Sequence, residues 1–372
     1  MTSERYIGLM SGTSLDGVDA ALIEISETGS LTTLATHYQP FCEGLQSNLS
    51  HLARAEQWPV DLFARTELNL TQQYATCVLH MLESANISSS SIRAIGAHGQ
   101  TIRHLPELGF SYQLINPSLL AAETGIDVIA DFRRADLARG GQGAPLLPSF
   151  HAELCRATDQ ARCLLNIGGI ANLTSLSPDG TTVGFDTGPG NTLINAWCRL
   201  KFKKDYDDKG AIARQGKVQA SLLRILLQDA YFLRPPPKST GPERFNLTWL
   251  DEHLLRFGEN VSDLDMLCTL VELTAKTSAD AIDTHSQAKD VLIFGGGIHN
   301  DYLLERLQAH LPSRRIGSTE RLGIDPDFME ATAFGWLAHR LLHDQPGNLI
   351  AVTGASSPAL LGGWYPSGRS LS

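Results

Sequence analysis

The sequence lacks the cysteine patterns of disulfide-rich and zinc-binding proteins. Its six cysteines are scattered, with no C-x-x-C pair and no Cys/His cluster: Cys42, Cys77, Cys155, Cys163, Cys198 and Cys268. Secreted domains that depend on disulfides carry many closely spaced cysteines. The spacing here instead favours reduced thiols in the cytosol.

Membrane and export signals are also missing. No run of about 18 consecutive apolar residues occurs, and the N-terminal residues lead directly into a strand-like segment rather than a charged stretch followed by an apolar one. We therefore expect a cytoplasmic protein with no membrane partner. The net charge of −10 argues against nucleic acid as a binding partner. An acidic protein can still bind an anion through glycine loops, helix N-termini and a few arginines.

Two common nucleotide motifs are absent, namely G-x-x-x-x-G-K-[ST] and a complete G-x-G-x-x-G followed by an acidic residue. Their absence disfavours a P-loop NTPase and a dinucleotide-dependent oxidoreductase. What the chain does contain is 33 glycines distributed over 372 residues. That length exceeds what one hydrophobic core usually supports, so we expect two α/β domains with a cleft between them.

The stretch RYIGLMSGTSLDGVDAALIEI, residues 5–25, predicts a β-hairpin with an unusual turn. Strand-like runs flank a small-residue cluster and an Asp-Gly pair suited to positive φ. Glycine lets a phosphate approach the backbone, the hydroxyls donate hydrogen bonds, and a carboxylate can hold Mg²⁺ or its waters. The residues in question are Gly12, Thr13, Ser14, Leu15, Asp16, Gly17, Val18 and Asp19, with Asp16 and Asp19 as the metal candidates. Taken alone, an ordinary hairpin explains the stretch equally well.

Further along, the apolar patterns predict alternating strands and helices. Expected strands are 31–38, 92–97, 126–130, 162–167, 173–176 and 291–294, and expected helices are 59–82, 146–154, 262–285, 301–310 and 330–342, the last rich in small residues that permit close packing. Residues 234–241, with three consecutive prolines, predict an extended surface segment. Asn191 or Thr192 is expected to cap a helix that follows a short strand.

A glycine-rich stretch at 139–145 suggests a domain boundary nearby, and we divide the chain into residues 1–130 and 131–372. The second half opens as the first does, with a strand, a glycine turn at 168–172 and a return strand. This similarity hints at an internal duplication.

Three glycine turns, at 11–17, 186–192 and 295–297, each follow a predicted strand. Separated by about a domain each, they can converge on one polyphosphate. Asp186, beside Gly188 and Gly190, is the carboxylate best suited to act as a base, although an Asx turn would also explain it. Arg133 and Arg134 can bind a carboxylate or phosphate bidentately or simply be solvated. His98 and Glu330 can also have purely structural roles, His98 as a buried histidine at a strand end and Glu330 as a favourable partner of the helix dipole.

Seven motifs occur in order between Tyr6 and His339: IGLMSGTSLDGVD, GAHGQTIRH, ADFRRADLARGGQGAPL, LLNIGGIANLT, GFDTGPGN, FGGGIHN and MEATAFGWLA. Together they closely resemble the anhydro-N-acetylmuramic acid kinase family of the sugar kinase, Hsp70 and actin superfamily.

The resemblance implies two ribonuclease-H-like domains of the actin-like ATPase fold, with ATP and Mg²⁺ in the cleft between them. It implies that the enzyme opens the 1,6-anhydro ring of 1,6-anhydro-N-acetylmuramic acid with water and phosphorylates O6, in cell-wall recycling and as a homodimer. Asp186 then corresponds to the general base. The remaining ATP-binding candidates are Gly168, Gly169, Gly188, Gly190, Asn191, Gly295, Gly296 and Gly297, and the sugar-binding candidates are His98, Gln100, Arg133, Arg134 and Glu330.

Two alternatives stay open from the sequence. One is a sugar kinase of the same superfamily that phosphorylates an ordinary hydroxyl without adding water. The other is an ATP-dependent binding protein of the Hsp70 or actin type, although the chain offers no separate peptide-binding domain.

Overall fold

The computed structural model describes residues 3–12, 14–55, 57–157, 159–241 and 243–368. The chain folds as two compact units, Met1–Phe150 with Asp327–Ser372 and His151–Pro326. We expected a boundary after residue 130, but the first unit continues to Phe150. The C-terminal segment returns to the first unit, because strand β12 (Gly363–Tyr365) pairs with β6 (Val128–Ala130).

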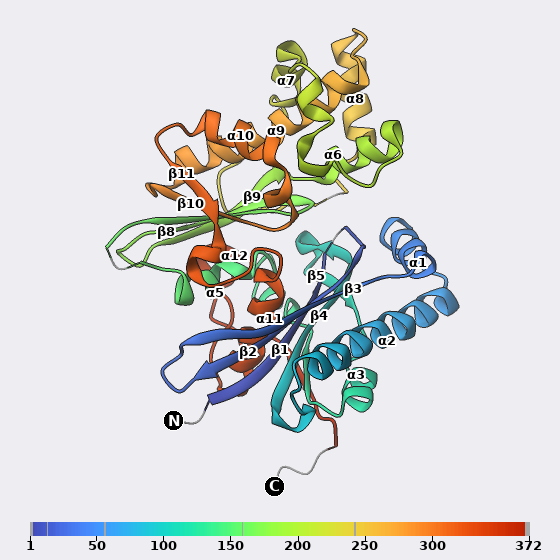
Figure 1. Cartoon of the computed structure of the whole chain (residues 1–372), viewed down its shortest axis with the longest axis vertical. Coiled ribbons are helices and arrows are strands. Elements are labelled where there is room, and N and C mark those ends of the chain that lie inside the picture. The colour runs from blue at the N-terminus through green and yellow to red at the C-terminus, as the bar shows by residue number, and fades with distance from the viewer. Residues whose placement is uncertain (1–2, 13, 56, 158, 242, 369–372) are drawn as a thin grey trace. The chain divides into compact units, whose positions relative to one another are not determined.

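The first unit is built on one mixed sheet (Figure 1). Its strands are β1 (Ser3–Ser11), β2 (Gly17–Ser26), β3 (Leu31–Pro40), β4 (Ile92–Leu105), β5 (Phe110–Leu114), β6 and β12. The order is β12-β6-β4-β1-β2-β3, with β5 pairing with β4. Strands β1, β2 and β3 form an antiparallel meander, whereas β4 and β6 run parallel to β1. The expected hairpin and third strand are confirmed.

Helices cover both faces of this sheet. They are α1 (Glu43–Arg54), α2 (Val60–Ser84), α3 (Pro117–Thr124), α4 (Arg134–Leu137), α11 (Met329–Leu342) and α12 (Ile350–Thr353). Apolar side chains of α1, α2 and α3 share one core with Ile7, Leu9 and Leu22 of the sheet. Helix α11 lies on the opposite face, against β1 and β4, where a Cβ at Gly96 would come within 2.0 Å of the Phe334 carbonyl oxygen.

The second unit repeats the arrangement with β7 (Arg162–Ile167), β8 (Ile170–Leu176), β9 (Thr182–Pro189), β10 (Asp290–Phe294) and β11 (Arg315–Ser318). Its sheet order is β11-β10-β7-β8-β9. Its helices are α6 (Thr192–Trp197), α7 (Ala220–Leu226), α8 (Leu247–Phe257), α9 (Asp263–His285) and α10 (Asp301–His310), while α5 (Leu147–Leu154) spans the boundary between the units.

The same order, a three-strand meander followed by two strands parallel to its first strand, thus occurs in both units. This is the ribonuclease-H-like topology, and the two units share it.

Several local expectations were wrong. The strand expected at 92–97 runs on to Leu105 and forms a hairpin with β5, so residues 98–104 belong to a strand. In the first turn the positive φ falls on Leu15, at 59°, rather than on the Asp16-Gly17 pair. Asn191 occupies the N-cap position of α6, but its side chain makes no cap because its amide donates instead to the Ile167 carbonyl, 3.1 Å away.

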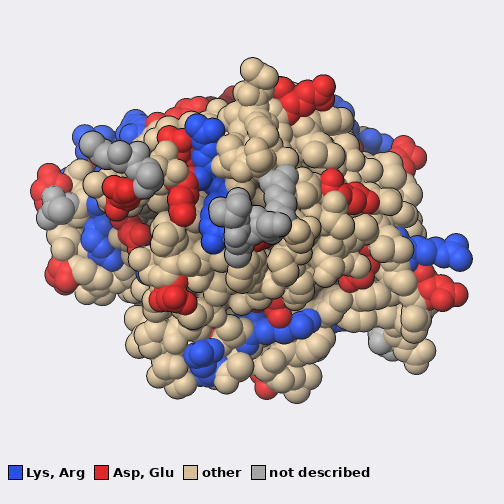
Figure 2. Space-filling view, turned by 90° about the horizontal axis from the view of Figure 1, so that it is seen from below, with Lys and Arg blue, Asp and Glu red and all other residues tan. Residues whose placement is uncertain are grey.

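Charged side chains of both signs lie on the surface of the protein (Figure 2). On the face shown in Figure 2, basic and acidic side chains of the described residues are interspersed among uncharged ones. Among the described residues, the helices are all too short or too polar to cross a membrane.

Candidate active site

The turn between β1 and β2 is held in place by contacts with α2 and β4. The buried Ser11 hydroxyl lies 2.6 Å from the Tyr74 hydroxyl of α2, and the Gln100 amide donates to the Gly12 carbonyl over 3.1 Å. A Cβ at Gly12 would meet the Ser14 hydroxyl only at 3.6 Å, so the protein leaves space there. At Gly17, by contrast, a Cβ would lie 2.5 Å from the Gln39 carbonyl. Gly12 is therefore the residue around which a ligand has room, and Gly17 is a packing residue.

Hard oxygen atoms lie on this turn. The Asp16 carboxylate accepts a hydrogen bond from the Ser14 hydroxyl at 2.7 Å, and Asp19 lies three residues further on, in β2. Burial, together with the nearby Asp16 and Asp19 carboxylates, raises the pKa of Tyr38 to about 12. Both carboxylates thus lie close enough to Tyr38 to act on it electrostatically. Thr13 and its predicted hydroxyl contact lie outside the described residues.

His98, Arg133 and Glu330 form a second group in the first unit. The His98 Nδ1 donates to the Gly99 carbonyl at 2.7 Å, and its Nε2 accepts from the Arg133 Nε and Nη2 at 3.1 and 2.8 Å. Burial, reinforced by Arg133, holds the pKa of His98 well below its usual range. The ring is thus neutral and fixes the guanidinium, rather than serving as a cationic acid.

The two neighbouring arginines point to different partners. Arg133 also donates to the Gly143 carbonyl at 2.8 Å. Arg134, whose side chain is 49% exposed, contacts Asp131 at 3.4 Å and lies over the Tyr112 ring. Glu330 lies in the first turn of α11, where burial raises its pKa while Arg133 acts to lower it. The sequence-predicted residues His98, Arg133 and Glu330 therefore lie together, and Arg134 lies apart.

In the second unit, Asp186 lies within β9, three residues before the strand ends at Pro189. Its Oδ2 accepts from the Thr240 backbone N–H at 2.9 Å, and its own N–H donates to the Lys238 carbonyl at 3.2 Å. The Tyr231 hydroxyl donates to the Asp186 carbonyl at 2.7 Å. The side chain is 9% exposed, so a small part of it reaches solvent. Such a carboxylate is oriented by a backbone donor and can accept a proton.

Sequence reasoning missed the residues that surround Asp186. Two of them, Lys238 and Thr240, come from residues 234–241, which we expected to be an extended surface segment; the segment is irregular, and these two residues bond to Asp186 of β9. The Lys238 ammonium lies 4.8 Å from the Tyr231 ring centre, and burial lowers its pKa while Asp186 raises it. The lysine and threonine that follow the proline run were the one available signal.

The glycine turns of the second unit interlock. The N–H groups of Gly190 and Thr192 donate to the Gly169 carbonyl, and that of Asn191 donates to the Gly168 carbonyl. A Cβ at Gly190 would lie 2.4 Å from the Gly168 carbonyl oxygen, and one at Gly188 would lie 2.7 Å from the Phe232 ring. The tight packing explains glycine at these positions without any ligand.

The three glycines of the turn after β10 differ in the space that surrounds them. A Cβ at Gly295 would lie 2.3 Å from the Asn166 side-chain oxygen, and one at Gly297 would lie 2.3 Å from Ile167. A Cβ at Gly296 would meet nothing within 4 Å. The Asn166 oxygen is buried and has no hydrogen-bond partner among the described residues. Asn166, a polar residue at the end of a buried strand, is thus a further candidate that we had not singled out.

The comparisons with known proteins cover almost the entire chain. Residues 4–367 match the family model described as anhydro-N-acetylmuramic acid kinase. A curated anhydro-N-acetylmuramic acid kinase of Coxiella burnetii is 47% identical over 370 residues, covering 98% of each chain. One from Hahella chejuensis is 49% identical over 369 residues, covering 98% of this chain and 99% of the relative.

Similarity to solved structures is weaker. Component A of the (R)-2-hydroxyglutaryl-CoA dehydratase of Acidaminococcus fermentans has a TM-score of 0.49 at 9% identity, and the alignment covers 89% of this chain and 96% of that one. No shared activity follows at that level. The match over residues 4–367 and relatives at 47–49% identity show that the chain belongs to the anhydro-N-acetylmuramic acid kinase family.

Proposed function

We propose that this kinase uses ATP and water to convert 1,6-anhydro-N-acetylmuramic acid into N-acetylmuramic acid 6-phosphate and ADP. The observation that carries the proposal is the Asp186 carboxylate, which is almost buried and oriented by the Thr240 N–H. A base of this kind can take the proton of a water that attacks C1 of the sugar. Membership of the kinase family supports the substrate class.

In the proposed reaction, each bond that forms is matched by one that breaks. The water oxygen forms the new bond to C1 as Asp186 accepts a proton, and the C1–O6 bond breaks as in inverting glycoside hydrolysis. O6 then forms a bond to the γ-phosphorus while the bond to the ADP oxygen breaks. The configuration at C1 is inverted by this path.

We assign ATP and sugar binding to the candidate residues of the sequence motifs. The proposed ATP contacts are the 12–19 turn, the turns at 168–169 and 188–191, and residues 295–297, with space at Gly12 and Gly296 supporting backbone approach. Asp16 and Asp19 would hold Mg²⁺, which neutralises phosphate charge. His98, Gln100, Arg133, Arg134 and Glu330 are the proposed sugar contacts. A cytoplasmic homodimer acting in cell-wall recycling completes the proposal.

The test is to run the reaction in ¹⁸O-labelled water and analyse the product by mass spectrometry. Ring opening by water predicts one labelled oxygen at C1. As a control, product made in ordinary water and then held in labelled water for the same time reports exchange alone. An unlabelled product would favour a sugar kinase that adds no water. ATP hydrolysis with no phosphorylated sugar would favour an Hsp70- or actin-type binding protein.

A further inference from the structure

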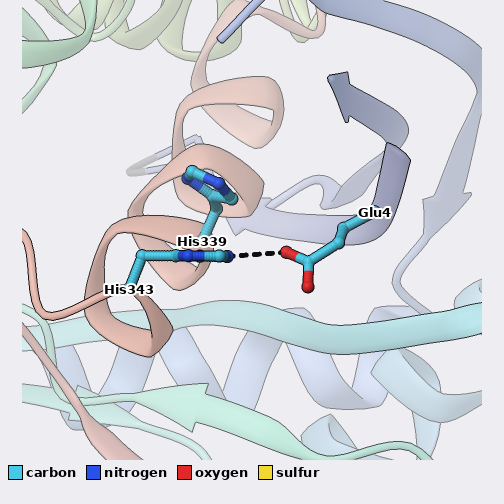
Figure 3. Close-up of side chains that lie close together, drawn as sticks. All are labelled: Glu4, His339 and His343. Atoms are coloured by element: carbon cyan, nitrogen blue, oxygen red, sulfur yellow. Dashed lines mark hydrogen bonds and ion pairs between the residues drawn. The ribbon is translucent and has the colours of Figure 1, made fainter. Parts of the chain in front are cut away.

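Two histidines and one carboxylate lie close together in the first unit, away from the groups discussed above. His339 and His343 are one helical turn apart at the C-terminal end of α11, so they share a face of the helix. Glu4 lies near the start of β1. One ligand atom from each residue can be chosen so that all three lie within 4.8 Å of one another. Figure 3 shows His343 directed at Glu4, with the ring of His339 beside that of His343.

Close backbone packing fixes the two elements that carry these side chains. A Cβ at Gly8 of β1 would lie 1.7 Å from the Ala331 carbonyl oxygen of α11, and a Cβ at Gly335 would lie 3.1 Å from the Gly8 nitrogen. Helix α11 therefore rests directly on β1 without intervening side chains. Ligands mounted on two elements in such contact are held in position before any ion binds.

The contacts inside the cluster suit metal ligands. The Glu4 Oε2 accepts from the His343 Nε2 at 2.7 Å and from the hydroxyl of the buried Tyr6 at 2.5 Å. Hydrogen bonds such as the one from the Tyr6 hydroxyl orient ligating carboxylates in metalloproteins. The Tyr6 ring also meets the His339 ring edge-on, at 5.4 Å between centroids.

His339 is the residue that a hydrogen-bond network alone leaves unexplained. Its Nδ1 is buried without a hydrogen-bond partner among the described residues. Its ring lies 4.3 Å from that of His343, the second histidine of the cluster. A ring nitrogen in this position can offer a lone pair to a metal ion, as imidazoles do in metalloproteins.

We propose that Glu4, His339 and His343 form a binding site for a divalent transition-metal ion of the Zn²⁺ type. Two imidazoles and one carboxylate with a water in the fourth position are a common zinc ligand set. Tetrahedral ligands about 2.1 Å from the ion lie roughly 3.4 Å apart. The observed separations, from 2.7 Å to within 4.8 Å, reach that value through small side-chain rotations.

The site is structural rather than part of the phosphoryl transfer. Glu330 lies near the other end of α11, 13 residues from His343, which is about 20 Å along a helix. An ion here ties the last turn of α11 to the start of β1. It differs in chemistry from the Mg²⁺ proposed for ATP, since Mg²⁺ prefers oxygen ligands.

The test uses the full-length protein and Zn²⁺ alone, without nucleotide. Titration calorimetry should give one ion per chain with micromolar or tighter affinity, and Zn²⁺ should raise the unfolding temperature. Glu4→Gln and His343→Gln should each weaken binding by at least tenfold and remove the stabilisation. His51→Gln, on an exposed position of α1, is the matched control and should bind as wild type does. Co²⁺ should give the visible absorption of a tetrahedral centre.

Absence of binding to the wild-type protein would overturn the proposal. So would equal binding by wild type and both variants, or binding that is lost on Cys42→Ser, since Cys42 is an exposed thiol. Turnover of His343→Gln should match that of wild type, and a loss of turnover without a loss of Zn²⁺ binding would count against a purely structural site.

Discussion

At the scale of single residues, Asp186 is the group whose chemistry the proposed reaction needs. We expect Asp186→Asn to lower turnover by roughly 10²-fold or more, the usual scale for loss of a positioned base. The amide keeps an oxygen that can accept from the Thr240 N–H, so ATP and sugar affinity should stay close to wild type. Steady-state kinetics and calorimetry measure the two effects separately. Turnover within a few-fold of wild type would remove Asp186 from the mechanism.

Arg133 and Arg134 offer a matched pair because their surroundings differ. Arg133→Lys removes the fork that holds the His98 ring and the Gly143 carbonyl, so KM for the anhydro sugar should rise about tenfold or more with little change in KM for ATP. Arg134→Lys should have a small effect, since its contacts with Asp131 and the Ser111 carbonyl are 3.4 and 3.3 Å long and its side chain is half exposed. If the two variants bind the sugar as wild type does, neither arginine clamps its carboxylate.

Gly12 tests whether the first turn acts through its backbone. Because the protein leaves space around a Cβ there, Gly12→Ala and Gly12→Val should fold normally. If a phosphate approaches this backbone, ATP affinity should fall in the order wild type, Ala, Val. Calorimetry with thermal unfolding of each variant separates the two effects. Unchanged ATP affinity in Gly12→Val would show that the turn does not bind ATP.

At the scale of elements, local patterns predicted most of the sheet and the longest helices. The strands of the first meander, α2 and α9 carry strong periodicity and lie close to their expected bounds. Strand β5 was missed because its pairing with the polar end of β4 is a tertiary contact. The Asp186 environment was missed for the same reason. Its partners lie 45 and 54 residues away in the sequence, beyond any local pattern.

The crossing of β1 and α11 makes a prediction for stability. Gly8→Ala places a methyl group into the Ala331 carbonyl, which must move, so the free energy of unfolding should fall by about 3 kcal/mol or more. Gly44→Ala is the matched control, because a Cβ there meets nothing within 4 Å and alanine favours the helix by up to about 1 kcal/mol. Urea unfolding measures both. Equal midpoints for Gly8→Ala and wild type would contradict the packing.

At the scale of the whole molecule, the two units share one strand order but differ in the packing of their equivalent turns. The β1–β2 turn of the first unit and the β7–β8 turn of the second occupy the same place in that order. One leaves space at Gly12, whereas the other is filled by the Gly190 backbone. A repeat of motifs in the sequence could suggest the duplication. It could not show which copy of the turn is open, because that depends on the segment packed against it.

Buried neutral histidines predict how stability depends on pH. Burial lowers the pKa of His104 to about 4 and that of His151 to about 3, and holds that of His98 well below its usual range. The unfolded chain takes up protons near pH 6.5, where the folded protein does not. Stability is therefore complete above that pH and falls as the pH drops from about 6.5 toward 4, by about 1.4 kcal/mol per pH unit for each such histidine.

Urea unfolding between pH 7 and pH 5 measures this slope. His104→Gln keeps a side-chain amide that can bond to the Ser111 hydroxyl but cannot take up the proton, so the slope should become smaller by about 1.4 kcal/mol per pH unit. The exposed His51→Gln should leave the slope unchanged, because its environment differs little between the folded and unfolded chain. If His104→Gln has the wild-type slope, the His104 ring is not held neutral by the fold, and the loss of stability in acid has another source.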